Sequence, residues 1–127
     1  MKNRAASGGN VKEPYIIVVD DDSDVLEMAG CFFREAGVEV HCVESGSRAL
    51  EKIREKGYAV MLTDFNMPGM NGLELAEKVR EISPQIQIIM ATGHPSPELS
   101  FLAAKAGIAK VLAKPLHLAG FLDLVKR

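Results

Sequence analysis

Cysteine is scarce in this 127-residue chain, which contains only Cys31 and Cys42. Both lie within apolar stretches, and neither has a second metal-ligating group close by in the sequence. A disulfide framework or a structural zinc site needs more such residues at a regular spacing, so neither holds this fold together. We expect both cysteines to be reduced residues of the core.

Long hydrophobic runs are also missing. The longest apolar stretches, such as residues 15–19 and 58–62, are strand-sized and fall far short of the roughly 20 residues that a membrane span needs. Residues 1–13 contain no apolar segment of the kind found in secretory signal peptides. We therefore expect no membrane insertion and a cytoplasmic location.

The chain carries no large excess of charge of either sign. Its 15 Lys and Arg residues against 17 Asp and Glu residues give a formal net charge of -2. Direct binding to nucleic acid through a general positive field is therefore disfavoured. Hydrophobic residues make up 47% of the sequence, which at this length predicts one compact domain with an apolar core.

Short apolar runs rich in β-branched residues recur along the chain and predict five strands. These runs are residues 15–19, 38–43, 59–62, 86–91 and 110–113. Helical patterns separate them, and strict strand–helix alternation predicts right-handed crossovers, hence an α/β fold with a parallel sheet covered on both faces. Residues 1–13 show neither pattern, so we expect a flexible segment there, followed by a single domain over residues 14–127.

Several residues in these patterns are expected in the core. Met28, Met61 and Met90 fall in helical or strand patterns and are interpreted as packing residues. Leu102 recurs with Leu99 and neighbouring alanines at helical spacing, which predicts one apolar face on that helix.

Polar residues follow four of the five predicted strands, at the edge where an open parallel sheet binds its ligands. The four strand ends read Asp20-Asp21-Asp22, Thr63-Asp64, Thr92-Gly93 and Lys114-Pro115. Converging carboxylates without Arg or Cys suit a hard cation with oxygen ligands, which favours Mg²⁺ over zinc or copper. A metal, an ammonium and a hydroxyl together supply the charge stabilisation that phosphoryl transfer needs, with Asp64 as the nucleophile.

Each of these residues also has an ordinary structural explanation. Asp22 and Asp24 suit the amino terminus of a helix, and we assign them to capping. Asp64 could open a turn, Thr92 could end a strand, and Lys114 could be a solvated surface residue. The functional interpretation depends on complementary groups occurring at four strand ends together.

Four stretches of the sequence resemble, in order, the signatures of the response regulator receiver domain. They are residues 16–21, 62–72, 89–93 and 112–115, and the likeness extends over residues 15–127. The resemblance implies a flavodoxin-like, doubly wound five-stranded sheet of order 2-1-3-4-5. It also implies a signalling switch of a two-component system or phosphorelay, which takes its phosphoryl group from a phosphohistidine on a histidine kinase or a histidine phosphotransfer protein and catalyses its own phosphorylation and dephosphorylation.

The resemblance assigns a role to each matching residue of the metal site. Asp64 would be the phosphorylation site. Asp21 and Asp64 would bind Mg²⁺ directly, and Asp20 would act mainly through bound water. Asn66 would offer its backbone carbonyl to the metal.

The resemblance also assigns the groups that meet the phosphoryl oxygens. Thr92 would reach them with its hydroxyl and Lys114 with its ammonium, and the Lys114–Pro115 peptide bond would be cis. One position departs from the family pattern, because Val111 stands three residues before the lysine, where Tyr or Phe is usual. The aromatic half of the usual activation switch is therefore missing.

Three other functions compete with the signalling switch. A haloacid-dehalogenase-like phosphatase usually has a second Asp two residues after the nucleophile, where this chain has Asn66. A flavin carrier would need a Ser, Thr or Gly phosphate loop after the first strand, where this chain has aspartates. A receiver serving only as a docking scaffold stays open, as does the choice between a stand-alone protein and part of a larger regulator or hybrid kinase.

Overall fold

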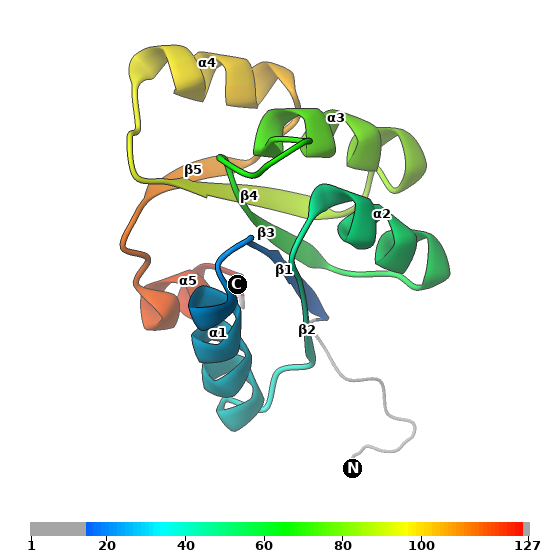
Figure 1. The fold of residues 1–127 in the computed structure, drawn as a ribbon, viewed down its shortest axis with the longest axis vertical. Coiled ribbons are helices and arrows are strands. Elements are labelled where there is room, and N and C mark those ends of the chain that lie inside the picture. The colour runs from blue at the N-terminus through cyan, green and yellow to red at the C-terminus, as the bar shows by residue number, and fades with distance from the viewer. Residues whose placement is uncertain (1–14, 126–127) are drawn as a thin grey trace.

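The computed structural model describes residues 15–125, so the predicted flexible segment of residues 1–13 lies outside the described part. Five strands form one parallel sheet, drawn in the middle of Figure 1. The strands are β1 (Ile16–Val19), β2 (Val40–Val43), β3 (Val60–Asp64), β4 (Gln87–Thr92) and β5 (Lys110–Ala113).

Helices alternate with the strands along the chain. They are α1 (Ser23–Glu35), α2 (Gly46–Glu55), α3 (Gly72–Ile82), α4 (Pro97–Lys105) and α5 (Leu118–Val125). Figure 1 shows α1 and α5 on one face of the sheet and α2, α3 and α4 on the other. No helix within residues 15–125 combines the length and the apolar character needed to cross a bilayer.

The strand order is β2-β1-β3-β4-β5, with every neighbouring pair parallel. This confirms the predicted α/β class and the doubly wound order expected from the resemblance. The register pairs Val19 with Thr63, and Thr92 with Ala113. Because the strands run in one direction, the residues that follow them gather at one edge of the sheet.

Two apolar cores lie on the two faces of the sheet. Successive residues of β1 point to opposite faces, so Ile17 packs with α2 and α3, whereas Ile16 packs with α1 and α5. Phe33 of α1 and Phe121 of α5 meet edge to face with ring centroids 5.7 Å apart. This double burial explains why β1 is a continuous apolar run and why β3 begins with one.

Three residues expected in the core are exposed instead. Met28 is 62% exposed, Leu102 is 49% exposed, and Cys31 also faces solvent, while Cys42 is half-buried. In both helices a small residue takes the inward position, since Ala29 and Ala103 follow Met28 and Leu102 and are buried. A neighbour one position away on a helix points in a different direction.

The start of α3 packs directly on the strand that carries Asp64. Asn71 caps the helix, because its side chain accepts from the Glu74 N–H while the Glu74 carboxylate accepts from the Asn71 N–H. The Gly72 N–H donates to the Phe65 carbonyl at 2.9 Å. A Cβ at Gly72 would lie 2.6 Å from the Asp64 carbonyl oxygen, so only glycine fits without a shift of the backbone.

We expect Gly72→Ala to lower the free energy of unfolding by about 1–3 kcal/mol, because the added methyl group overpacks the junction between β3 and α3. Gly57→Ala is the matched control. A Cβ at Gly57 would have no neighbour within 4 Å, so its effect should stay within about 0.5 kcal/mol. Urea denaturation of both variants gives the comparison, and equal midpoints would show that the close approach at Gly72 is unimportant.

Candidate functional site

Three carboxylates gather at the carboxyl edge of the sheet. Asp20 directly follows β1, and Asp64 is the last residue of β3, the neighbouring strand. One oxygen from each of Asp20, Asp21 and Asp64 lies within 4.8 Å of the others. Asp20 and Asp64 are buried, at 4% and 9% exposure, whereas Asp21 faces solvent. The cluster is therefore open on one side.

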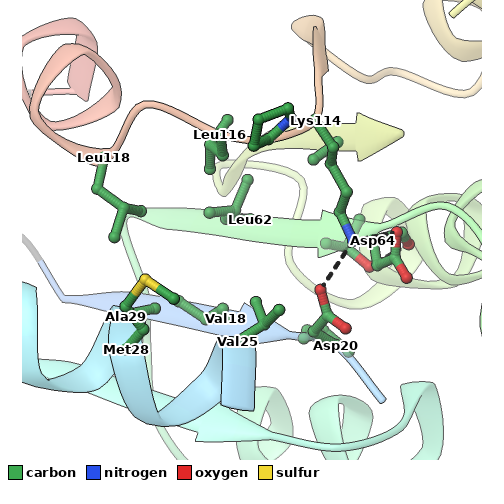
Figure 2. Close-up of a pocket in the computed structure, with 14 residues that line it drawn as sticks. Val18, Asp20, Val25, Met28, Ala29, Leu62, Asp64, Lys114, Leu116 and Leu118 are labelled. Carbon is green, nitrogen blue, oxygen red and sulfur yellow. Dashed lines mark hydrogen bonds and ion pairs between the residues drawn. The ribbon is translucent and has the colours of Figure 1, made fainter. Parts of the chain in front are cut away.

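Lys114 joins this cluster from the end of β5. Its Nζ lies 3.0 Å from Asp64 Oδ1 and 3.2 Å from Asp20 Oδ2, and Figure 2 shows the side chain reaching down to both carboxylates. The Lys114 N–H donates to the Thr92 carbonyl at 2.8 Å, which fixes the lysine backbone beside β4. The Lys114–Pro115 peptide bond is cis, as the resemblance implied.

The pKa values of the two ends of this ion pair are both shifted. Burial raises the pKa of Asp64, the hydrogen bond from Lys114 opposes that rise, and the nearby Asp20 charge adds to it. Burial alone would lower the pKa of Lys114, but its hydrogen bonds to Asp64 and Asp20 outweigh burial and raise it. The lysine therefore stays charged while it offsets the repulsion between the carboxylates.

The amino terminus of α1 orients Asp20. The Asp22 N–H donates to Asp20 Oδ1 at 3.0 Å, so both oxygens of Asp20 have partners. Asp22 is the N-cap of α1, and its side chain accepts from the Asp24 N–H at 2.9 Å. Its capping role follows the prediction from sequence. The capped helix in turn fixes the acidic loop that carries Asp20 and Asp21.

Thr92 ends β4 next to the cluster and is buried, at 1% exposure. Its hydroxyl oxygen accepts from the His94 N–H at 3.1 Å, which ties the side chain to the loop before α4. The sequence pattern missed this contact because a backbone N–H supplies it. Any movement of the Thr92 hydroxyl would also disturb the start of that loop.

The remaining predicted residues lie at the margins of the site. Asn66 is exposed, two residues beyond Asp64. Val111 is half-buried on β5, pairs with Met90 on β4, and packs against the core under α2, α3 and α4. A valine there fills a core position but is too short to reach between the interior and the surface.

The donor set fits a divalent cation. Three carboxylates and one ammonium leave an excess of negative charge, and the exposed Asp21 keeps one side open to solvent. Carboxylate oxygens with room for water are the ligands that Mg²⁺ prefers.

Comparison with known proteins gives related sequences. The chain is 32% identical over 112 residues to the response regulator receiver protein CpdR of Brucella abortus, covering 88% of this chain and 93% of that protein. It is 32% identical over 117 residues to the response regulator protein TmoT of Ectopseudomonas mendocina, covering 92% of this chain and 53% of that protein. The chain thus spans nearly all of the first relative and about half of the second.

Solved structures of response regulator proteins also resemble this chain. A receiver domain protein (CheY-like) from Methanospirillum hungatei JF-1 has a TM-score of 0.84 and 31% identity, covering 89% of this chain and 90% of that one. The chemotaxis protein CheY4 of Vibrio cholerae has a TM-score of 0.84 and 30% identity, covering 90% and 97%.

A family model described as the response regulator receiver domain matches residues 16–126, a stretch that takes in every strand of the sheet and the acidic cluster at its edge. The chain therefore belongs to the response regulator receiver domain family, whose general function is phosphorylation on an aspartate in two-component signalling.

Proposed function

We propose that Asp64 is the residue phosphorylated in this receiver domain, and that the domain extends over residues 14–127. The observation that carries the proposal is the position of Lys114, whose ammonium lies within 3.2 Å of both Asp20 and Asp64. This position supports the proposal, because the proposed nucleophile, carboxylates suited to a metal and a cation suited to phosphate then lie in one cluster. In this proposal the phosphoryl donor is a phosphohistidine on a histidine kinase or a histidine phosphotransfer protein, and the proposed location is the cytoplasm.

Asp64 acts as the nucleophile. One of its carboxylate oxygens forms a bond to phosphorus while the P–N bond to the donor imidazole breaks, and the electron pair of that bond stays on the imidazole nitrogen. The hydrogen bond from Lys114 opposes the raised pKa of Asp64 and so favours its ionised, nucleophilic form.

Mg²⁺ would be held by Asp20, Asp21, Asp64 and the backbone carbonyl of Asn66. When bound, it neutralises the carboxylates and the oxygens of the arriving phosphoryl group. The acidic character of the cluster supports this ligand set, because Lys114 provides the nearby ammonium but offsets only part of the charge.

Thr92 and Lys114 stabilise the phosphoryl group. The Lys114 ammonium pairs with one phosphoryl oxygen and the Thr92 hydroxyl donates to another. The domain's own residues thereby catalyse both its phosphorylation and its later hydrolysis, without a separate active site. Since the Thr92 hydroxyl also accepts from the His94 N–H, its engagement by phosphate would shift the loop that leads into α4.

Acetyl phosphate or phosphoramidate with Mg²⁺ should add one phosphate to the protein, because the site supplies its own transfer chemistry. Intact-mass analysis should detect an acid-stable, base-labile adduct. Asp64→Asn keeps the size of the side chain but removes the nucleophile, so the adduct should disappear.

Asp22→Asn is the matched control, because asparagine preserves the helix cap, and it should still be modified. The same adduct on the Asp64→Asn variant would disprove the assignment. The absence of an adduct on the protein without any substitution would favour a receiver that serves only as a docking scaffold.

Val111 leads to a prediction about the response of the distal surface. Beryllofluoride, a phosphate mimic, should shift the amide resonances of Asp64, Thr92 and Lys114 strongly, but those of α4 and α5 only modestly. Val111→Tyr should enlarge the shifts in α4 and α5, since a tyrosine is long enough to move between buried and exposed positions.

Val111→Leu provides the control, because leucine fills the position but cannot toggle, and it should respond like the unmodified protein. Large shifts in α4 and α5 of the unmodified protein, unchanged by the tyrosine, would contradict the prediction. The effect of beryllofluoride binding on α4 and α5 would then be transmitted through Thr92 and its contact with the His94 N–H.

A further inference from the structure

A cavity of about 200 Å³ lies between α1 and α5, beside the acidic cluster. Figure 2 shows its walls: Met28 and Leu118 face each other across the opening, and Asp20, Asp64 and Lys114 stand at one end. Its main apolar lining consists of Val18 and Leu62 from the sheet, Val25, Met28 and Ala29 from α1, and Leu116 and Leu118 from the other side.

An aromatic contact between α1 and α5 lies outside the lining of the cavity. Phe33 and Phe121 close the layer towards the carboxyl end of α1, with ring centroids 5.7 Å apart. Nearer the acidic cluster, α1 presents the shorter side chains of Val25 and Ala29, which leave the space beside Leu118 unfilled. The floor of the cavity is the sheet itself.

The size of the cavity limits its occupant. A cavity of about 150 Å³ lined by apolar side chains, both aliphatic and aromatic, binds benzene, so this one has room for a molecule of one or two rings. A helix or a stretch of peptide backbone is too large for a space enclosed by the sheet, α1 and the segment that leads into α5.

The lining sets the chemistry of the occupant. The aliphatic walls offer water few hydrogen-bonding partners, and they favour hydrocarbon groups. At the polar end, the carboxylates of Asp20 and Asp64 stand against the single ammonium of Lys114, so an anionic molecule would be repelled. A neutral molecule with at most one polar group, directed to that end, matches both features.

We propose that this cavity is a binding site for a small, neutral, aromatic or branched aliphatic molecule. Binding would cover the exposed thioether of Met28, a side chain that adapts readily to different shapes, together with the half-buried Leu116 and Leu118. The cavity adjoins the proposed phosphoryl-binding groups, because Asp64 and Lys114 form part of its polar end.

Benzene and indole are the probes that test this proposal. Each would be titrated into the full chain while the methyl resonances of Val18, Met28, Leu62 and Leu118 are followed by ¹H–¹³C NMR. Saturable shifts confined to the cavity methyl groups, with a Kd on the order of 1 mM or lower, are expected for at least one probe.

Leu118→Trp should fill the cavity and weaken binding by about tenfold or more. Leu102→Trp is the matched control: it makes the same substitution at an exposed leucine on α4, away from the cavity, and should bind the probes like the unmodified protein. Val25→Phe, which narrows the cavity from α1, gives a second test should Leu118→Trp unfold.

Three results would overturn the proposal. The first is the absence of saturable shifts up to the solubility limit of both probes. The second is equal binding by Leu118→Trp and Leu102→Trp. The third is a set of shifts spread over Phe101 and Leu102 on α4, which would show adsorption to exposed apolar side chains instead of entry into the cavity.

Discussion

The ion pair that Lys114 forms with two buried carboxylates is the interaction on which the rest of the site depends. Asp20 and Asp64 end neighbouring strands, and the fold places their like charges side by side with little solvent to screen them. The ammonium, 3.0 and 3.2 Å away, offsets that repulsion. Leaving a buried charge without a partner is costly, so loss of the ammonium would destabilise the two carboxylates.

The architecture explains how such a cluster forms from residues far apart in the sequence. Parallel strands deliver their carboxyl ends to one edge, and each crossover helix returns the chain to the opposite edge for the next strand. Gly72 then lets α3 start in contact with the Asp64 carbonyl. Thr92 and Lys114 lie at the carboxyl ends of β4 and β5, and the Thr92 hydroxyl contacts the His94 N–H in the loop before α4.

Much of the fold could be predicted from sequence because it depends on local patterns. The β-branched runs determined the strands, and the strand ends pointed to Asp20, Asp64, Thr92 and Lys114, which the structure brings to one edge. The exposure of Met28 could not be predicted, since helical spacing does not tell which residues at the margin of an apolar stripe are buried. The contact of Thr92 with His94 depends on a backbone N–H, and the cavity depends on the separation of α1 and α5. Neither feature leaves a pattern in the sequence.

The most direct test of the account is the pKa of the Asp64 carboxyl group, followed by ¹³C NMR in the unmodified protein and in Lys114→Met, which removes the charge but keeps most of the side chain. Because the lysine hydrogen bond opposes the rise caused by burial, the pKa should climb further above its ordinary value of 3.8 in the variant. A raised native pKa means that ionisation of Asp64 lowers the free energy of unfolding as the pH rises from 3.8 through the native value, and this loss should be larger in Lys114→Met.

Lys110→Met, at the exposed start of the same strand, should leave the pKa of Asp64 unchanged. An Asp64 pKa that is the same in Lys114→Met as in the unmodified protein, or lower, would contradict the central role given to this ion pair.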